Sequence, residues 1–192
     1  MNTPDQTSDV ALWVFGYGSL VWNPGFPFVR RELATLPGYH RSFCMRSIHH
    51  RGTVDAPGLV LALDPRPDAA CSGVAFGVAP AAVEQTLFDL RERELVSSAY
   101  LEMRLDVRLD HGPEVSALTY VVDPDHGQYC GGLPLDEQAA IIARAHGGRG
   151  PNADYLIHTA SHLSQLGLED PELDWLVARV LELTDVNRTA DH

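Results

Sequence analysis

The segment 101–109 constrains the fold most, because its residues alternate strictly between apolar and charged side chains. Such alternation buries one face of a β-strand and leaves the other in water. A turn, His111-Gly112-Pro113, and a second apolar segment, 115–122, follow directly. The pattern therefore predicts an antiparallel hairpin with one buried face.

Four shorter apolar segments precede this hairpin and are set between glycine and proline breakers. Short apolar segments in such a setting are typical of strands. They cover residues 12–15, 43–45, 59–63 and 74–78. The sheet is therefore expected to come first along the chain.

Apolar residues at helical spacing predict four helices. The first covers residues 80–94, with Pro80 near the first turn, where its missing N–H costs little. The others are expected at 135–146, at 152–166 and from the capping residue Asp170 onward. Strands followed by helices predict an α+β fold, a mixed sheet or small barrel flanked by helices.

The length of 192 residues fits one ordinary domain, and neither a repeat nor a low-complexity linker marks a second. We therefore expect a single domain over 1–192, with polar tails at about 1–10 and 186–192. Asp and Glu number 26 against 14 Lys and Arg, a formal charge of −12. This balance argues against a nucleic-acid partner. It leaves room for a small anionic substrate, because a few aimed N–H groups or one arginine attract an anion locally.

The three cysteines, Cys44, Cys71 and Cys130, are an odd number at wide spacing, and the first ten residues are polar. This pattern predicts neither an export signal nor a disulfide framework. No apolar run approaches the roughly 18–20 residues that span a bilayer. We therefore expect a cytoplasmic protein with reduced cysteines and no membrane partner.

The densest chemical signal is the segment 15–22, Phe-Gly-Tyr-Gly-Ser-Leu-Val-Trp. Two glycines after a strand let the backbone turn sharply and present consecutive N–H groups to an anion. Val21 stands where a dinucleotide fingerprint requires a third glycine. The flanking glycines of a nucleophile elbow around Ser19 are also missing. A strand that ends in a tight turn, with Tyr17 and Trp22 in the core, explains the same pattern equally well.

Glu94 closes the run Arg91-Glu92-Arg93-Glu94 at the end of the first predicted helix. Such a run is most often a solvated charged face. The negative end of the helix nevertheless disfavours an ionised carboxylate, which would raise the proton affinity of Glu94 toward that of a useful base.

Neither the histidines nor the cysteines give a clear site. His158 and His162 lie four residues apart on a predicted helix, but the glutamate of a zinc-protease motif is missing between them. His49 and His50 would point to opposite faces of a strand. Cysteine is more often a small buried hydrophobe than a nucleophile. We therefore assign no metal, no cofactor and no catalytic cysteine.

Eight segments, taken in order, together resemble the ChaC family of glutathione-specific γ-glutamylcyclotransferases. They are 17–22, 41–44, 50–53, 57–63, 73–76, Arg93-Glu94 with Tyr100, 117–119 and 150–156. The resemblance spans about residues 12–170, and the order of the segments is more specific than any one motif. Family members often have glycine at the two positions before the tyrosine, where this chain has Ser98 and Ala99.

The resemblance implies a closed or nearly closed β-barrel with helices around it. The family's acid/base carboxylate falls on Glu94 rather than Glu92. Tyr155 matches a tyrosine of the binding pocket in the wider family. The loop that holds the γ-glutamyl group falls on Tyr17, Gly18, Ser19, Leu20, Val21 and Trp22.

The implied activity is the degradation of glutathione, by attack of its α-amine on the γ-amide carbonyl to give 5-oxoproline and Cys-Gly. No metal or cofactor is implied, and the expected partner is this small molecule alone. Three alternatives stay open at this point. They are a cyclotransferase for other γ-glutamyl amino acids or amines, a non-catalytic module that binds small acids, and a serine hydrolase that uses Ser19.

Overall fold

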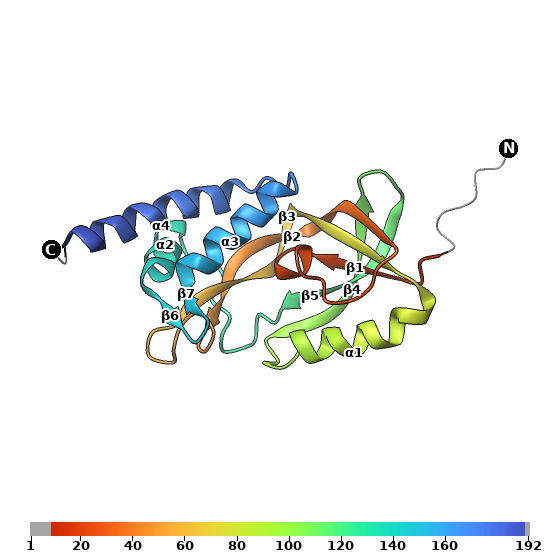
Figure 1. Ribbon diagram of the computed structural model, residues 1–192, viewed down its shortest axis with the longest axis horizontal. Coiled ribbons are helices and arrows are strands. Elements are labelled where there is room, and N and C mark those ends of the chain that lie inside the picture. The colour runs from red at the N-terminus through yellow and green to blue at the C-terminus, as the bar shows by residue number, and fades with distance from the viewer. Residues whose placement is uncertain (1–8, 191–192) are drawn as a thin grey trace. The chain divides into compact units, whose positions relative to one another are not determined.

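The computed structural model describes residues 9–190 (Figure 1). Of the expected polar tails, residues 1–8 and 191–192 lie outside this range. The helix α4, Pro171–Ala190, continues through most of the expected C-terminal tail. None of the helices in the described range is both long enough and apolar enough to cross a membrane.

The chain's internal contacts divide it into two compact units. The barrel unit contains the described residues up to Arg41 together with Leu63–Asp123. The helical unit contains Ser42–Ala62 and the described residues from Pro124 onward. Each unit is therefore built from segments that are separated in the sequence, a division that no linker in the sequence indicated. The expectation of a single domain stays a prediction.

Five strands form a closed barrel in the order β1-β3-β2-β4-β5. They are β1 (Leu12–Gly16), β2 (Arg30–Ser47), β3 (Gly58–Val78), β4 (Tyr100–Leu109) and β5 (Glu114–Val122). Strand β1 pairs antiparallel with β3, and β4 pairs antiparallel with both β2 and β5. The parallel pairing of β1 with β5 closes the ring. The predicted α+β class, with a small mixed barrel and helices, is confirmed.

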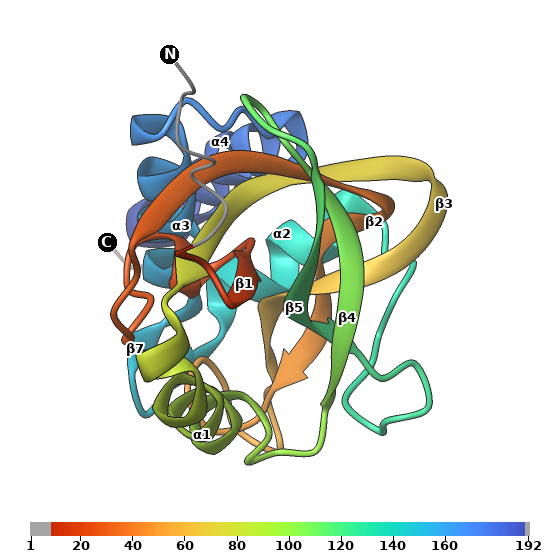
Figure 2. The ribbon, with the colours of Figure 1, turned by 90° about the vertical axis from the view of Figure 1, so that its right-hand side faces the viewer.

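The hairpin predicted from strict alternation is present as β4 and β5, two neighbouring green strands in Figure 2. Its register places Leu101 opposite Val121 and Val107 opposite Val115. Burial of the apolar face increases along β4, from an exposed Leu101 to a fully buried Val107. The alternating residues therefore enter the core most deeply near the turn.

A cluster of apolar side chains forms the core of the barrel unit. Every strand contributes to it, so burial of these side chains from water stabilises the closed ring. Its buried members are Phe15, Tyr17, Ala34, Leu36, Leu63, Cys71, Ala75, Val107, Leu109, Ala117 and Val121.

Strands β2 and β3 are much longer than the apolar segments that predicted them. They contain 18 and 21 residues, whereas the sequence indicated 43–45 in β2 and only 59–63 and 74–78 in β3. The middle of β3 includes two prolines and is largely exposed at 65–68. Because those residues face water, they carry no apolar pattern from which a strand is predicted.

The predicted first helix is confirmed as a short 3-10 turn, Pro80–Ala82, that leads into α1, Val83–Glu94. Leu90 and Thr86 lie on its buried face. The helix ends where the N–H of Leu95 bonds to the carbonyl of Arg91. Ser98 then adopts φ = 56° before β4 begins. This left-handed conformation favours glycine and costs other residues about 1–2 kcal/mol.

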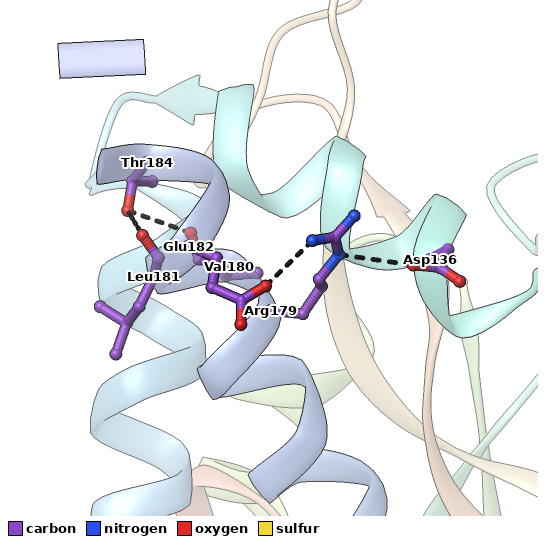
Figure 3. Close-up of polar contacts among 6 residues, drawn as sticks. All are labelled: Asp136, Arg179, Val180, Leu181, Glu182 and Thr184. Atoms are coloured by element: carbon purple, nitrogen blue, oxygen red, sulfur yellow. Dashed lines mark hydrogen bonds and ion pairs between the residues drawn. The ribbon is translucent and has the colours of Figure 1, made fainter. Parts of the chain in front are cut away.

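The helical unit contains the other three predicted helices, α2 (Leu135–Arg144), α3 (Asn152–Gln165) and α4. Asp170 caps α4 by accepting the N–H of Leu173, as the sequence predicted. Arg179 of α4 forms ion pairs with Asp136 of α2 and with Glu182 (Figure 3). The two-residue strands β6 (His146–Gly147) and β7 (Gly150–Pro151) were not predicted, because two residues are too few to show a period.

Asn152 joins the start of α3 to the start of β3. Its side-chain oxygen accepts the N–H of Leu59 at 2.7 Å, and its side-chain nitrogen donates to the carbonyl of Leu59 at 2.8 Å. The side chain is fully buried. The amide thus pairs with β3 in the way a neighbouring strand would.

Candidate active site

The Gly-rich turn, residues 16–22, begins where β1 ends at Gly16. It contains a 3-10 turn, Ser19–Val21, closed by a bond from the N–H of Val21 to the carbonyl of Gly18 at 2.9 Å. A Cβ atom on Gly16 would lie 3.0 Å from the Cβ of Leu20, so glycine lets the chain fold back on the strand. A Cβ atom on Gly18 would meet nothing within 4 Å. The turn therefore borders open space at Gly18.

Most side chains of this turn point into the protein. Tyr17, Leu20 and Val21 are buried, whereas Ser19 and Trp22 are partly buried. Tyr17 belongs to the barrel core, as the alternative interpretation of this segment predicted, whereas Trp22, which it also placed in the core, is only partly buried. The first N–H groups of a 3-10 turn have no acceptor within it. The groups of the turn that are available to a ligand are therefore mainly its backbone N–H groups.

A buried arginine fixes the start of the turn. The Nε of Arg41 donates to the carbonyl of Tyr17 at 2.7 Å, and a terminal nitrogen of the same side chain donates to the carbonyl of Ser72. Arg41 is only 6% exposed. This contact could not be predicted from the sequence, because Arg41 lies 24 positions from its partner and in no motif that reports a backbone contact.

Glu94 is the last residue of α1, and its side chain is 19% exposed. Burial raises the pKa of this carboxyl above its ordinary value, while the charge of Arg93 opposes the rise. The position of Glu94 at the helix end predicted a raised proton affinity, and in the structure burial is the main cause of the raised pKa. Glu92, two residues earlier, is exposed.

Arg93 contacts both the Gly-rich turn and Glu94. Its two terminal nitrogens donate to the hydroxyl of Ser19 at 2.7 Å and to the carbonyl of Asn23 at 2.8 Å. Its Nε lies 3.2 Å from Oε1 of Glu94. One side chain therefore brings together the two segments that sequence patterns singled out separately.

A second carboxylate, Glu102 of β4, lies in a network with Arg91 and Tyr120. Arg91 binds both of its oxygens, at 2.8 and 2.9 Å, and the hydroxyl of Tyr120 donates to it at 3.0 Å. The Arg91 bonds hold the pKa of Glu102 below its ordinary value. Burial and the charge of Glu102 raise the pKa of Tyr120, and Glu94 contributes to this rise. Only the alternation in β4 hinted at this network, by making Glu102 a charged residue on the outer face.

Tyr155 belongs to α3, in the helical unit. Its hydroxyl accepts the N–H of Leu61 at 3.4 Å, and its ring meets that of Phe43 edge to face, with centroids 6.0 Å apart. The guanidinium of Arg51 lies 5.6 Å from the centre of the same ring. Its role in substrate binding stays a prediction.

Within residues 9–190 no group of three or more histidine, cysteine or acidic side chains is arranged to hold a metal ion. His158 is exposed on α3. One cavity of about 550 Å³ lies in the helical unit, between α3 and α4, and includes Leu163, Asp170 and Asp174 in its lining. None of the site residues predicted from the sequence lines it.

Comparison with known proteins relates the whole arrangement to one family. The family model of ChaC-like proteins matches residues 12–183. A glutathione-specific γ-glutamylcyclotransferase of Escherichia coli (strain K12) is 38% identical over 92% of this chain and 75% of its own length. Glutathione-specific γ-glutamylcyclotransferase 1 of Danio rerio is 37% identical to this chain, over 89% of each of the two chains.

Two further proteins extend the comparison. Gamma-glutamylcyclotransferase 2-3 of Arabidopsis thaliana is 32% identical over 95% of this chain and 94% of its own length. The crystal structure of a yeast γ-glutamyl cyclotransferase specific to glutathione superimposes with a TM-score of 0.78 at 25% identity, covering 90% of this chain and 99% of the other. The chain therefore belongs to the ChaC-like family.

Proposed function

We propose that this protein is an enzyme that degrades glutathione, closing the γ-glutamyl group into 5-oxoproline and releasing Cys-Gly. Three relatives with 32–38% identity, which match about nine tenths of the chain, are named γ-glutamylcyclotransferases, and two of these names specify glutathione. One observation supports the mechanism: the largely buried carboxylate of Glu94 is joined through Arg93 to the Gly-rich turn. We place the activity in the cytoplasm, on the basis of the number and spacing of the cysteines.

The reaction needs no second molecule. The α-amine and the γ-carbonyl of glutathione lie on the same short chain, so attack closes a five-membered ring. The bond to the cysteine nitrogen then breaks, and Cys-Gly departs. Groups held in such geometry reach effective molarities of about 10⁵–10⁸ M. The protein's main task is therefore to hold the substrate folded back on itself.

In this mechanism Glu94 is the acid/base. Its carboxylate takes the proton that the attacking α-amine gives up and returns it to the departing amine of Cys-Gly. Proton transfer of this kind contributes roughly 10²–10⁴ in rate, and it works best when the pKa of the base approaches the operating pH. The burial that raises the pKa of Glu94 acts in this direction.

The Gly-rich turn is the proposed subsite for the γ-glutamyl group. The buried side chains of Tyr17, Leu20 and Val21 leave the backbone N–H groups as the contacts, with Gly18 bordering open space. These N–H groups suit the α-carboxylate of the substrate and equally the oxyanion that forms at the γ-carbonyl. Trp22 and Ser19 complete the turn, and Tyr155 remains a proposed binding residue.

Product analysis tests the proposal. The purified protein is incubated with glutathione, glutathione disulfide and simple γ-glutamyl amino acids, and the products are identified by mass spectrometry. We expect 5-oxoproline and Cys-Gly from glutathione, with turnover unchanged by a chelator. Binding without products would favour a non-catalytic module, and faster turnover of γ-glutamyl amino acids would redirect the substrate assignment. Loss of turnover with a chelator and recovery with zinc would contradict a metal-independent reaction.

A further inference from the structure

We infer that Arg93 is the positioning residue of this site, which fixes the Gly-rich turn and the carboxylate of Glu94 with respect to each other. The inference rests on the proposed function, because it takes Glu94 as the acid/base and the turn as the substrate's subsite. Arg93 lies in one of the segments that resemble the ChaC family, but nothing in the sequence indicated what its side chain does.

The geometry of Arg93 supports this role. Each of its three nitrogens meets a different partner: the hydroxyl of Ser19 at 2.7 Å, the carbonyl of Asn23 at 2.8 Å and the carboxylate of Glu94 at 3.2 Å. Ser19 begins the 3-10 turn, and Asn23 follows the Gly-rich turn directly. Arg93 thus contacts the first residue of the 3-10 turn and the residue that follows the Gly-rich turn. A planar guanidinium presents several donors in a fixed fork, which the single ammonium of lysine does not reproduce.

The same contact defines what Ser19 does. Its hydroxyl accepts a hydrogen bond from a guanidinium, which stays protonated in proteins and takes up no proton. A serine nucleophile requires a neighbouring base that removes its proton. Ser19 therefore serves as an anchor for Arg93, and this local chemistry disfavours the serine-hydrolase alternative.

Arg93 also acts on Glu94 through its charge. Burial raises the pKa of Glu94, and Arg93 is the charged neighbour that lowers it. A further titratable group that interacts with Glu94 is Tyr120 of β5, which is bonded to Glu102 of β4 and through it to Arg91. The segment 16–23 contributes no charged side chain. Loss of the Arg93 charge should therefore leave burial unopposed and raise the pKa of Glu94 further.

Arg91 is a matched control on the same helix. It lies two residues before Arg93 and makes a two-point contact with a carboxylate, but its partner is Glu102. A variant at Arg91 removes the same charge from the same end of α1 without touching a described contact of the Gly-rich turn. Differences between variants at the two positions therefore report the contacts of Arg93 and not the charge of the helix.

The test compares Arg93→Gln, Arg93→Lys and Arg91→Gln by the pH dependence of kcat/KM. A base must be ionised to act, so the wild-type rate falls as the pH drops through the pKa of Glu94. In Arg93→Gln we expect this acid limb to move to higher pH, and kcat/KM at its optimum to fall about 10–100-fold through misplacement of the turn. Arg93→Lys should keep the limb in place but lose about tenfold in rate. Arg91→Gln should keep the wild-type limb.

A second measurement is independent of turnover. The carboxyl carbon of Glu94 is titrated by NMR in the wild type and in Arg93→Gln, after both spectra show a folded protein. We expect a higher pKa in the variant. An unchanged pKa, or an Arg93→Gln rate within about threefold of wild type, would overturn the inference. Absence of 5-oxoproline from the wild type would instead reject the proposed function, while the titration would still decide whether Arg93 and Glu94 are coupled.

Discussion

Glu94 at the end of α1 and Glu102 in β4 carry the same chemical group at similar exposure, with 19% and 22% of their side chains accessible. Their pKa values shift in opposite directions: that of Glu94 is raised and that of Glu102 is lowered. The difference lies in their surroundings: burial has the largest influence on the pKa of Glu94, whereas the hydrogen bonds from Arg91 have the largest influence on that of Glu102. Among the described residues, Arg91 and Tyr120 together give Glu102 three hydrogen bonds, whereas the charged contact of Glu94 is one ion pair with Arg93. Carboxylates whose environments push their pKa values apart are a pattern of acid/base sites, and this contrast supports the proposal of Glu94 as the acid/base.

The largest expected effect is that of Glu94→Gln on turnover. Glutamine keeps the shape of the side chain but relays no proton, so we expect 5-oxoproline release to fall by about 10²–10⁴. Glu92→Gln is the matched control at an exposed position of the same run and should change the rate little. Equal product release by the wild type and Glu94→Gln would reject the assignment of the acid/base.

Although Glu94→Gln should lose activity, we expect it to be at least as stable as the wild type. A carboxyl with a raised folded-state pKa is stabilising when protonated, and this contribution is lost as the pH rises from the unfolded-state pKa through the folded-state pKa. Ionising this largely buried carboxyl therefore costs the folded wild type free energy, and glutamine does not carry this cost. The melting temperature of the variant at pH 7 should equal or exceed that of the wild type.

An intermediate effect is expected for Glu102→Gln, on stability rather than on chemistry. A carboxyl with a lowered folded-state pKa stabilises the protein above its unfolded-state pKa, and the contribution is lost as the pH falls through the folded-state value. We expect the free energy of unfolding in urea to drop by about 1–2 kcal/mol at pH 7, with the difference shrinking in acid. A difference that stays constant with pH would contradict the role of ionised Glu102.

The smallest effect is expected for Tyr120→Phe. The change removes one hydrogen bond to Glu102 and leaves the Arg91 contacts in place, so the free energy of unfolding should fall by about 0.5–1 kcal/mol. Product release should stay within a few-fold of wild type. A loss of rate close to that of Glu94→Gln would mean that the two carboxylates work as one unit, and the contrast between them would then fail.

Patterns that repeat along the chain predicted most of the fold. Strict alternation gave the hairpin of β4 and β5, and helical spacing placed the end of α1 at Glu94. The long exposed parts of β2 and β3 escaped prediction, because residues that face water are under no demand for apolar side chains. The division into two units also escaped it, since the contacts that define it join distant segments.

The candidate site likewise contains some features that the sequence predicted and others that it did not. The Gly-rich turn and Glu94 carry local signals, namely two glycines after a strand and a carboxylate at a helix end. The roles of Arg93 and Arg41 depend on partners 74 and 24 positions away. An arginine that bonds to a distant hydroxyl or carbonyl looks, in a single sequence, like any other charged residue. Such long-range contacts can be identified only in the three-dimensional structure.

The inward orientation of Leu20 and Val21 has a consequence for how this segment changes over time. If peptide groups make the contacts with the ligand, then substitutions at these two positions are filtered by the volume of the core and not by the chemistry of the guest molecule. Apolar residues of similar size should interchange there while recognition is conserved. Because a point mutation changes the side chain and leaves the peptide group in place, selectivity that depends on main-chain contacts should tolerate most point mutations.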